Sequence, residues 1–179
     1  VNQLFKNIQR SQLGNMITIP TDCPQRDERF AWAGDMQVFS NTAAYNADVY
    51  NYLADFLKVF RYNQETSGSL PDEAYKQNDV GGNIGWADAG VIIPWQLYLH
   101  YGDMSILKDN YSMMKNYGEY ILSICDDYIC YKQGFGDLAA VNVSEESGVN
   151  TAQCAYVFLI LSKTASVIGY TEDADRYAI

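Results

Sequence analysis

The sequence has a single histidine, few basic residues and no closely paired cysteines, and each scarcity excludes a class of function. Besides His100 there are only four cysteines, and none stands in a Cys-x-x-Cys pair. The ligand spacing of a zinc site is therefore missing, and we expect no metal and no cofactor. Twelve Lys and Arg stand against 22 Asp and Glu, a net charge of −10. Nucleic acid and anionic membranes need a concentrated positive surface, so neither is expected as a partner.

Long apolar runs and a signal peptide are also missing. No stretch of 18 apolar residues occurs, so no membrane-spanning helix is expected. The composition is still that of a folded chain, since 48% of the residues are apolar and 14% aromatic, enough for one core. The chain opens without Met and closes within a helical pattern. We therefore expect residues 1–179 to be a single fragment of a larger domain, truncated at both ends.

Apolar residues recur three or four apart along most of the chain, which predicts helices. The expected helices cover 2–14, 36–63, 87–101, 104–124, 151–168 and a start near Thr171, with 36–63 as one helix of about seven turns. Two segments, 64–86 and 128–149, lack this period and are expected to be long loops. A short extended piece is expected at 16–19. No strand alternation is convincing, so the sequence predicts an all-α fold of paired helices, a helical toroid that is incomplete here.

The loop at 20–35 carries the most chemistry. It contains four carboxylates, two arginines and Trp32, and two prolines stiffen it. Hydrolysis of a glycosidic bond needs one protonated carboxyl to donate to the leaving oxygen and a second carboxylate to activate water or attack the sugar. Glu28 lies among Asp22, Asp27 and Asp35, and like-charge repulsion is expected to raise its pKa as that acid requires. The alternative to a catalytic role is that this segment is simply a charged loop exposed to solvent.

The loop resembles the signature segment of the bacterial α-L-rhamnosidases. The matching residues run from Ile19-Pro-Thr-Asp-Cys-Pro-Gln-Arg-Asp-Glu-Arg to Trp32-Ala-Gly-Asp35, and further matches include Gly85-Trp86-Ala87-Asp88 and Tyr101-Gly102-Asp103. The resemblance covers essentially the whole chain. It implies roughly the first half of an (α/α)6 barrel whose enzymes act with inversion.

Roles follow from this resemblance. Glu28 would be the general acid, while Trp32 and Trp86 would wall the pocket of a 6-deoxy sugar. The sugar hydroxyls would be held by Asp22, Arg26 and Asp35. Asp88 is left as either a sugar ligand or a helix cap, with capping favoured.

Two departures from the family pattern stand out. Gly136-Asp137 is followed by Leu138 where the family usually has tryptophan, so one wall of the pocket is changed. The family's general base is a glutamate much later in the barrel, and no residue of this chain is assigned to it.

Other functions stay open from the sequence. A glycosidase of another helical-toroid family would act on a different sugar, and a non-catalytic fragment would only bind one. The expected partner is a rhamnose-containing glycoside or polysaccharide. Self-association is expected because half a toroid leaves apolar faces uncovered. The sequence does not determine the compartment.

Overall fold

The computed structural model describes residues 1–75, 81–131, 133–138 and 140–178, and these form seven α-helices without a named strand. The helices are α1 (Asn2–Asn15), α2 (Ala33–Asn46), α3 (Tyr50–Tyr62), α4 (Ala89–Tyr101), α5 (Ser105–Ile124), α6 (Glu146–Ile168) and α7 (Thr171–Arg176). The all-α prediction is confirmed.

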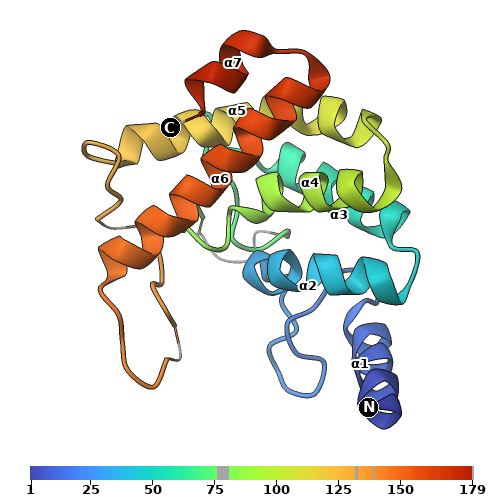
Figure 1. Cartoon of the computed structure of the whole chain (residues 1–179). Helices are drawn as coiled ribbons and strands as arrows, with labels where there is room; N and C mark the ends of the chain where they lie inside the picture. The colour runs from blue at the N-terminus through green and yellow to red at the C-terminus, as the bar shows by residue number, and fades with distance from the viewer. Residues whose placement is uncertain (76–80, 132, 139, 179) are drawn as a thin grey trace.

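The helices form two layers (Figure 1). In the first layer α4 packs between α2 and α6, and in the second α5 packs against α3. The ion pairs Lys115–Asp173 and Arg176–Glu119 tie α5 to α7, which also packs on α6. Each first-layer helix is followed in sequence by a second-layer helix, as expected of helical hairpins.

The connections at the two ends of the layers differ in length. Only a few residues link α2 to α3, α4 to α5 and α6 to α7, and the last two turns use Gly102 and Gly169 in the left-handed conformation that ends a helix. Three long loops, 16–32, 63–88 and 125–145, lead instead into the N-termini of α2, α4 and α6. The long irregular segments are therefore concentrated where these three helices begin.

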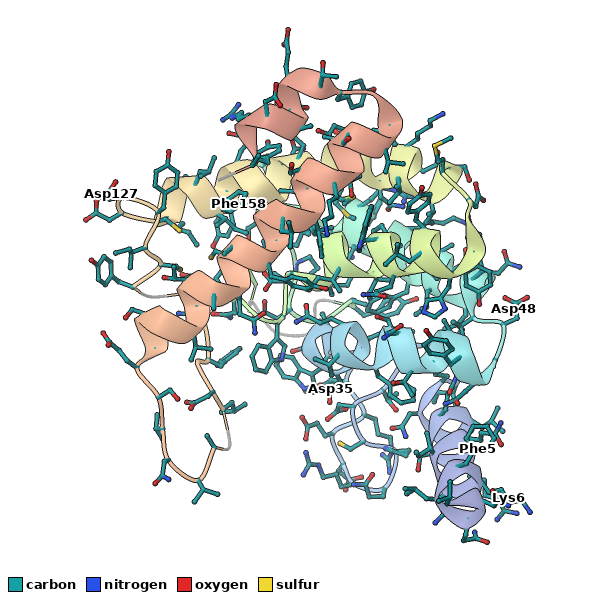
Figure 2. The ribbon with its side chains drawn as sticks, in the orientation of Figure 1. Phe5, Lys6, Asp35, Asp48, Asp127 and Phe158 are labelled. Carbon is teal, nitrogen blue, oxygen red and sulfur yellow. The ribbon has the colours of Figure 1, made fainter. Side chains whose placement is uncertain are left out.

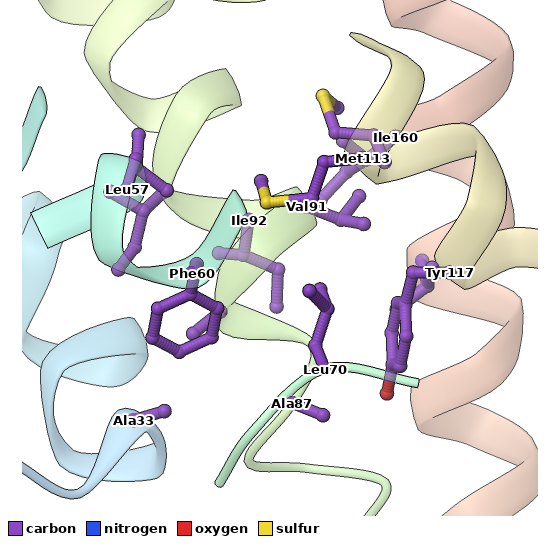
Figure 3. Close-up of a cluster of buried hydrophobic side chains, with 14 of the residues drawn as sticks. Ala33, Leu57, Phe60, Leu70, Ala87, Val91, Ile92, Met113, Tyr117 and Ile160 are labelled. Atoms are coloured by element: carbon purple, nitrogen blue, oxygen red, sulfur yellow. The ribbon is translucent and has the colours of Figure 1, made fainter. Parts of the chain in front are cut away.

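The core lies between the two layers. Leu53, Phe56, Leu57 and Phe60 recur at helical spacing along α3 and are each at most 4% exposed. Figure 3 shows Phe60 and Leu57 beside Ile92 of α4, with Leu70 and Ala87 contributed by the long loop. That loop is thus anchored by its own apolar residues.

The single helix expected over 36–63 is wrong, because the chain breaks into α2 and α3. Ala47 is extended, and the Asp48 carboxylate accepts a hydrogen bond from the Tyr50 amide at 3.2 Å, which starts a new helix. Figure 2 shows Asp48 at this corner. Val38 and Tyr45, which extended the apolar period, are 75% and 78% exposed. They do not belong to the buried face that the period implied.

The remaining predicted segments are confirmed with adjusted ends. The helical hairpin around Tyr101-Gly102-Asp103 is α4 and α5, while α6 begins five residues before the predicted start. Residues 64–75 and 81–86 form no helix, as expected, and 76–80 lie outside the described residues. The extended piece expected at 16–19 is reduced to an isolated bridge between Met16 and Pro20.

Within the described residues, one helix is long and apolar enough to cross a membrane by length and composition alone. This helix is α6, with a mean hydropathy of 1.3 over its best window, of which 39% is buried. The sequence still has no unbroken run of 18 apolar residues, because polar residues such as Asn150, Gln153 and Ser162 interrupt α6. The buried side of α6 packs against α4, α5 and α7.

Candidate active site

Isolated bridges and backbone hydrogen bonds join the three long loops. Trp32 pairs with Glu73, and the Ala33 amide donates to the Asp72 carbonyl at 2.7 Å, which connects the first loop to the second. Ile84 pairs with Gly134, and its amide donates to the Gln133 carbonyl at 2.8 Å, which connects the second loop to the third. These contacts align the loops into one surface above the helix N-termini.

That surface encloses a cavity of about 390 Å³. The lining residues come from all three loops and from α2, and they are Asp22, Cys23, Arg26, Glu28, Trp32, Asp35, Trp86, Phe135 and Leu138. All six residues predicted for the site are among them, although Trp86 is far from the others in sequence. Figure 2 shows Asp35 near the start of α2, at the edge of the loop region.

Two hydrogen bonds between Asp22 and Phe30 close the first loop (16–32) into a ring. The Asp22 amide donates to the Phe30 carbonyl and the Asp22 carboxylate accepts from the Phe30 amide, both at 3.0 Å. The Cys23 thiol lies 2.8 Å from the other carboxylate oxygen of Asp22. Arg29 adopts a positive φ of 56° inside this ring, which lets the chain turn tightly after Glu28. The carboxylates are therefore held by a rigid loop.

The Glu28 carboxylate accepts hydrogen bonds from the side chains of Trp32 and Arg26. The Trp32 indole donates to Oε1 at 2.9 Å, and the Arg26 guanidinium contacts Oε2 at 2.6 Å. The Trp32 hydrogen bond lowers the pKa of Glu28, with further lowering by Asp22 and Arg26, against partial burial that raises it. The raised pKa expected from neighbouring carboxylates is therefore wrong for the sugar-free site. The donors that contact Glu28 outweigh the effect of its partial removal from water.

Asp35 is the carboxyl in the cavity whose pKa moves upward. Partial removal from water raises the pKa of Asp35, and the charges of Asp22 and Glu28 add to the increase. Asp35 as a whole residue is still exposed to solvent. The cavity therefore contains one carboxyl with a lowered pKa and one with a raised pKa.

Trp86 forms a wall of the cavity because α2 provides room for it. A Cβ atom built on Gly34 would lie 2.9 Å from the indole Cε2 and Nε1 atoms, so only glycine permits this close approach. The Phe135 ring contacts Trp86 edge-on, with centroids 4.7 Å apart. The Gln37 side chain donates to the Gly85 carbonyl at 2.8 Å and fixes the turn that carries Trp86.

Asp88 neither lines this cavity nor caps α4 with its side chain. The carboxylate is fully buried, accepts from the Gly85 amide at 2.9 Å and from the Tyr117 hydroxyl at 2.7 Å, and makes no capping hydrogen bond. The favoured capping role is therefore wrong. Asp88 instead braces the turn before Trp86 against α5.

Sequence reasoning missed two lining residues. Cys23 is buried, and its sulfur accepts from the Arg26 Nε at 3.1 Å and lies 3.7 Å from a Glu28 oxygen. Phe135 lies in an irregular segment whose Gly-Phe-Gly sequence was the only available signal. Leu138, noted as a departure from the family pattern, does line the cavity.

Asp22, Cys23 and Glu28 place ligand atoms within 4.8 Å of one another. The Arg26 guanidinium already contacts both the Cys23 sulfur and the Glu28 carboxylate. A cation would have to replace that positive charge, so we assign no metal to this cluster.

Helical hairpins in two layers, with carboxylates and tryptophans on the loops at one end, define a helical-hairpin glycosidase domain. The chain belongs to the bacterial alpha-L-rhamnosidase 6 hairpin glycosidase domain family, whose sequence pattern matches residues 1–179.

Named relatives and a solved structure agree with this family. The chain is 37% identical to an alpha-L-rhamnosidase of Formosa agariphila, in a match that covers 99% of this chain. It is also 37% identical to an alpha-L-rhamnosidase of Alteromonas sp. (strain LOR), in a match that covers 100% of this chain. It also matches the Streptomyces avermitilis alpha-L-rhamnosidase complexed with L-rhamnose, with a TM-score of 0.93 and 34% identity over 98% of this chain. It spans 20%, 21% and 17% of those three proteins, respectively.

Proposed function

We propose that this chain provides the general-acid side of an active site that removes terminal α-L-rhamnose from a glycoside or polysaccharide with inversion. The observation that carries the proposal is the convergence of Glu28 with three polar side chains and two indoles on one cavity. The L-rhamnose complex of the Streptomyces avermitilis relative supports the choice of sugar.

In this proposal Glu28 donates a proton to the leaving oxygen. Asp22, Arg26 and Asp35 bind hydroxyl groups, and Trp32 and Trp86 contact the apolar face and the methyl group of the 6-deoxy sugar. An inverting reaction also needs a second carboxylate roughly 6.5–9.5 Å from the acid, so that a water fits between it and the sugar. The family resemblance assigns that base to a glutamate outside residues 1–179.

Because the pKa of Glu28 is lowered, the proposed general acid is an ionised carboxylate while no sugar is bound. A bound sugar ring removes water from Glu28 and so raises its pKa toward the protonated form. Arg26 can move away, because 64% of its side chain is exposed. Asp35, whose pKa is already raised, is the other carboxyl able to carry a proton in the cavity.

The test compares Glu28→Gln with Asp35→Asn in the protein at its native length. Both are assayed on a panel of aryl glycosides that differ in sugar and in the acidity of the leaving phenol. Loss of a general acid is expected to reduce kcat/KM by about 10²–10⁴-fold on poor leaving groups and far less on activated ones. We expect that pattern for Glu28→Gln and only on α-L-rhamnosides.

Asp35→Asn is expected to reduce kcat/KM by the same factor whichever phenol is the leaving group. The reason is that this variant loses a hydrogen bond to a sugar hydroxyl and not the proton donor. If Asp35→Asn shows the dependence on the leaving group and Glu28→Gln does not, Asp35 is the acid. Turnover of another sugar would identify a different glycosidase. Binding of L-rhamnose without turnover at native length would identify a sugar-binding protein.

A further inference from the structure

Three cysteines that are scattered in the sequence meet at one place in the fold. Cys125 follows the last turn of α5, Cys130 follows a tight turn, and Cys154 lies on α6. Their Sγ atoms all lie within 4.8 Å of one another. Cys130 is fully buried, Cys154 is 2% exposed and Cys125 is partly exposed. The cluster is therefore enclosed, with one sulfur accessible from outside.

The backbone around the cluster is held independently of the sulfurs. The Cys125 amide donates to the Ile121 carbonyl at 3.1 Å, and Asp126 and Ile129 exchange two backbone hydrogen bonds that close the turn. The Cys130 amide donates to the Thr151 hydroxyl at 3.1 Å, which ties the turn to the first part of α6. The three thiols are thus brought together by the packing of α5, the turn and α6.

We propose that Cys125, Cys130 and Cys154 bind one soft divalent metal ion of the zinc or cadmium type as three thiolates. Sulfur ligands select soft cations, and three sulfurs about 2.3 Å from one ion would lie about 4 Å apart, close to the spacing already present. The three S–H bonds break as three metal–sulfur bonds form. Three protons pass to solvent, and the site carries a net charge of −1.

A donor set of three sulfurs suits a soft cation. Burial raises the pKa of the Cys125 and Cys154 thiols, so without an ion these groups stay protonated. Such thiols are poor nucleophiles, which argues against a catalytic cysteine. A divalent ion offsets the charge that three buried thiolates would otherwise carry.

The position of the cluster gives such an ion a structural role. The segment that follows Cys130 carries Gly134, which approaches Asn150 of α6 too closely for any side chain, and then Phe135 of the cavity wall. An ion joining α5, the turn and α6 would anchor the start of that segment. This proposal rests on the thiol cluster alone and does not depend on the proposed function.

The test is a titration of the reduced, chelator-treated protein with Cd²⁺ in the absence of oxygen. We expect one ion per chain, a thiolate-to-cadmium charge-transfer band in the ultraviolet, release of three protons per ion and a rise in Tm. Loss of one ligand by Cys125→Ser or Cys154→Ser should weaken binding by more than the 10–100-fold that outer partners of a ligand typically contribute.

Cys23→Ser is the matched control, because Cys23 lies in another loop and contacts Asp22 and Arg26 instead. It should keep the band and the stoichiometry. Cys125→Ser decides the result if Cys154→Ser fails to fold, since Cys125 is partly exposed. The proposal is overturned if no band forms, if the band survives both cluster variants, or if it is lost with Cys23. A disulfide between two cluster cysteines in protein isolated without reductant also overturns it.

Discussion

At the residue scale, the chemistry of the site depends on which donors contact Glu28. Four acidic residues in one loop suggested repulsion, yet the Trp32 indole and the Arg26 guanidinium each contact a Glu28 oxygen. These hydrogen bonds and the charge of Arg26 outweigh the partial removal of Glu28 from water, so the pKa of Glu28 is lowered. The same loop holds Asp35, whose pKa is raised.

Arg26→Gln is expected to raise the pKa of Glu28, because it removes both a hydrogen bond and a positive charge. The shift should appear as an upward displacement of the Glu28 carboxyl titration, followed by nuclear magnetic resonance in the sugar-free protein. Arg29→Gln is the matched control, since Arg29 contacts Asp27 and Pro24 and has no recorded contact with Glu28. An equal shift in both variants would contradict the assignment.

At the element scale, the site exists because three loops enter the N-termini of α2, α4 and α6, and α4 packs between the other two helices. Each loop is fixed by a contact with a neighbour: Trp32 with Glu73, Ile84 with Gly134, and Gln37 of α2 with Gly85. The turn that carries Trp86 depends on the smallest residue of α2, Gly34.

Gly34→Ala is expected to displace the Trp86 indole, since the new methyl group would lie 2.9 Å from ring atoms. An aromatic contact is worth about 0.5–1.5 kcal/mol, so kcat/KM should fall roughly two- to tenfold, mainly through KM, with a change in tryptophan fluorescence. Gly14→Ala on α1 is the control, because nothing lies within 4 Å of its new methyl group. An unchanged KM in Gly34→Ala would show that Trp86 does not contact the sugar.

At the scale of the whole molecule, two fully buried carboxyls support the loop before α4. Asp72 accepts from the Asn83 amide at 3.0 Å and from its side chain, and Asp88 accepts from Gly85 and Tyr117. Burial raises the pKa of each to about 6, against the lowering by these donors. The charged forms are therefore costly at neutral pH, and the fold tolerates them because the donors are in place.

Because of Asp72 and Asp88, the free energy of unfolding is expected to fall as the pH rises from about 4 to about 6. In that window the folded chain retains protons that the unfolded chain has lost, because the folded pKa values exceed the ordinary value of 3.8. Asp88→Asn stays neutral, can donate to the Tyr117 oxygen and can still accept from Gly85. Relative to the wild type it should gain stability across this window, by about 2–3 kcal/mol above pH 6.

Chemical denaturation at a series of pH values measures this gain. Asp55→Asn, at an exposed carboxylate of α3, controls for the loss of one negative charge. A constant difference between Asp88→Asn and the wild type from pH 4 to pH 7 would contradict the raised pKa.

The expected self-association stays a prediction at this scale. The apolar side chains of Leu4, Phe5 and Leu13 on α1 are 64%, 50% and 74% exposed, and Figure 2 shows Phe5 on that helix.

The sequence by itself determined most of the helices and placed five of the candidate site residues in one segment. Apolar periodicity is a local property, and the signature loop keeps Asp22, Arg26, Glu28, Trp32 and Asp35 within 14 residues, so their proximity needed no tertiary information. Trp86 followed from a second motif.

Only the tertiary structure decided the break at Ala47–Val49, the burial of Asp88, the direction of the Glu28 pKa and the meeting of three cysteines. Each depends on which distant groups pack against a side chain. Spacing along the chain does not encode those contacts, because desolvation, hydrogen bonds and sulfur–sulfur distances arise only when α5, α6 and the long loops are packed together.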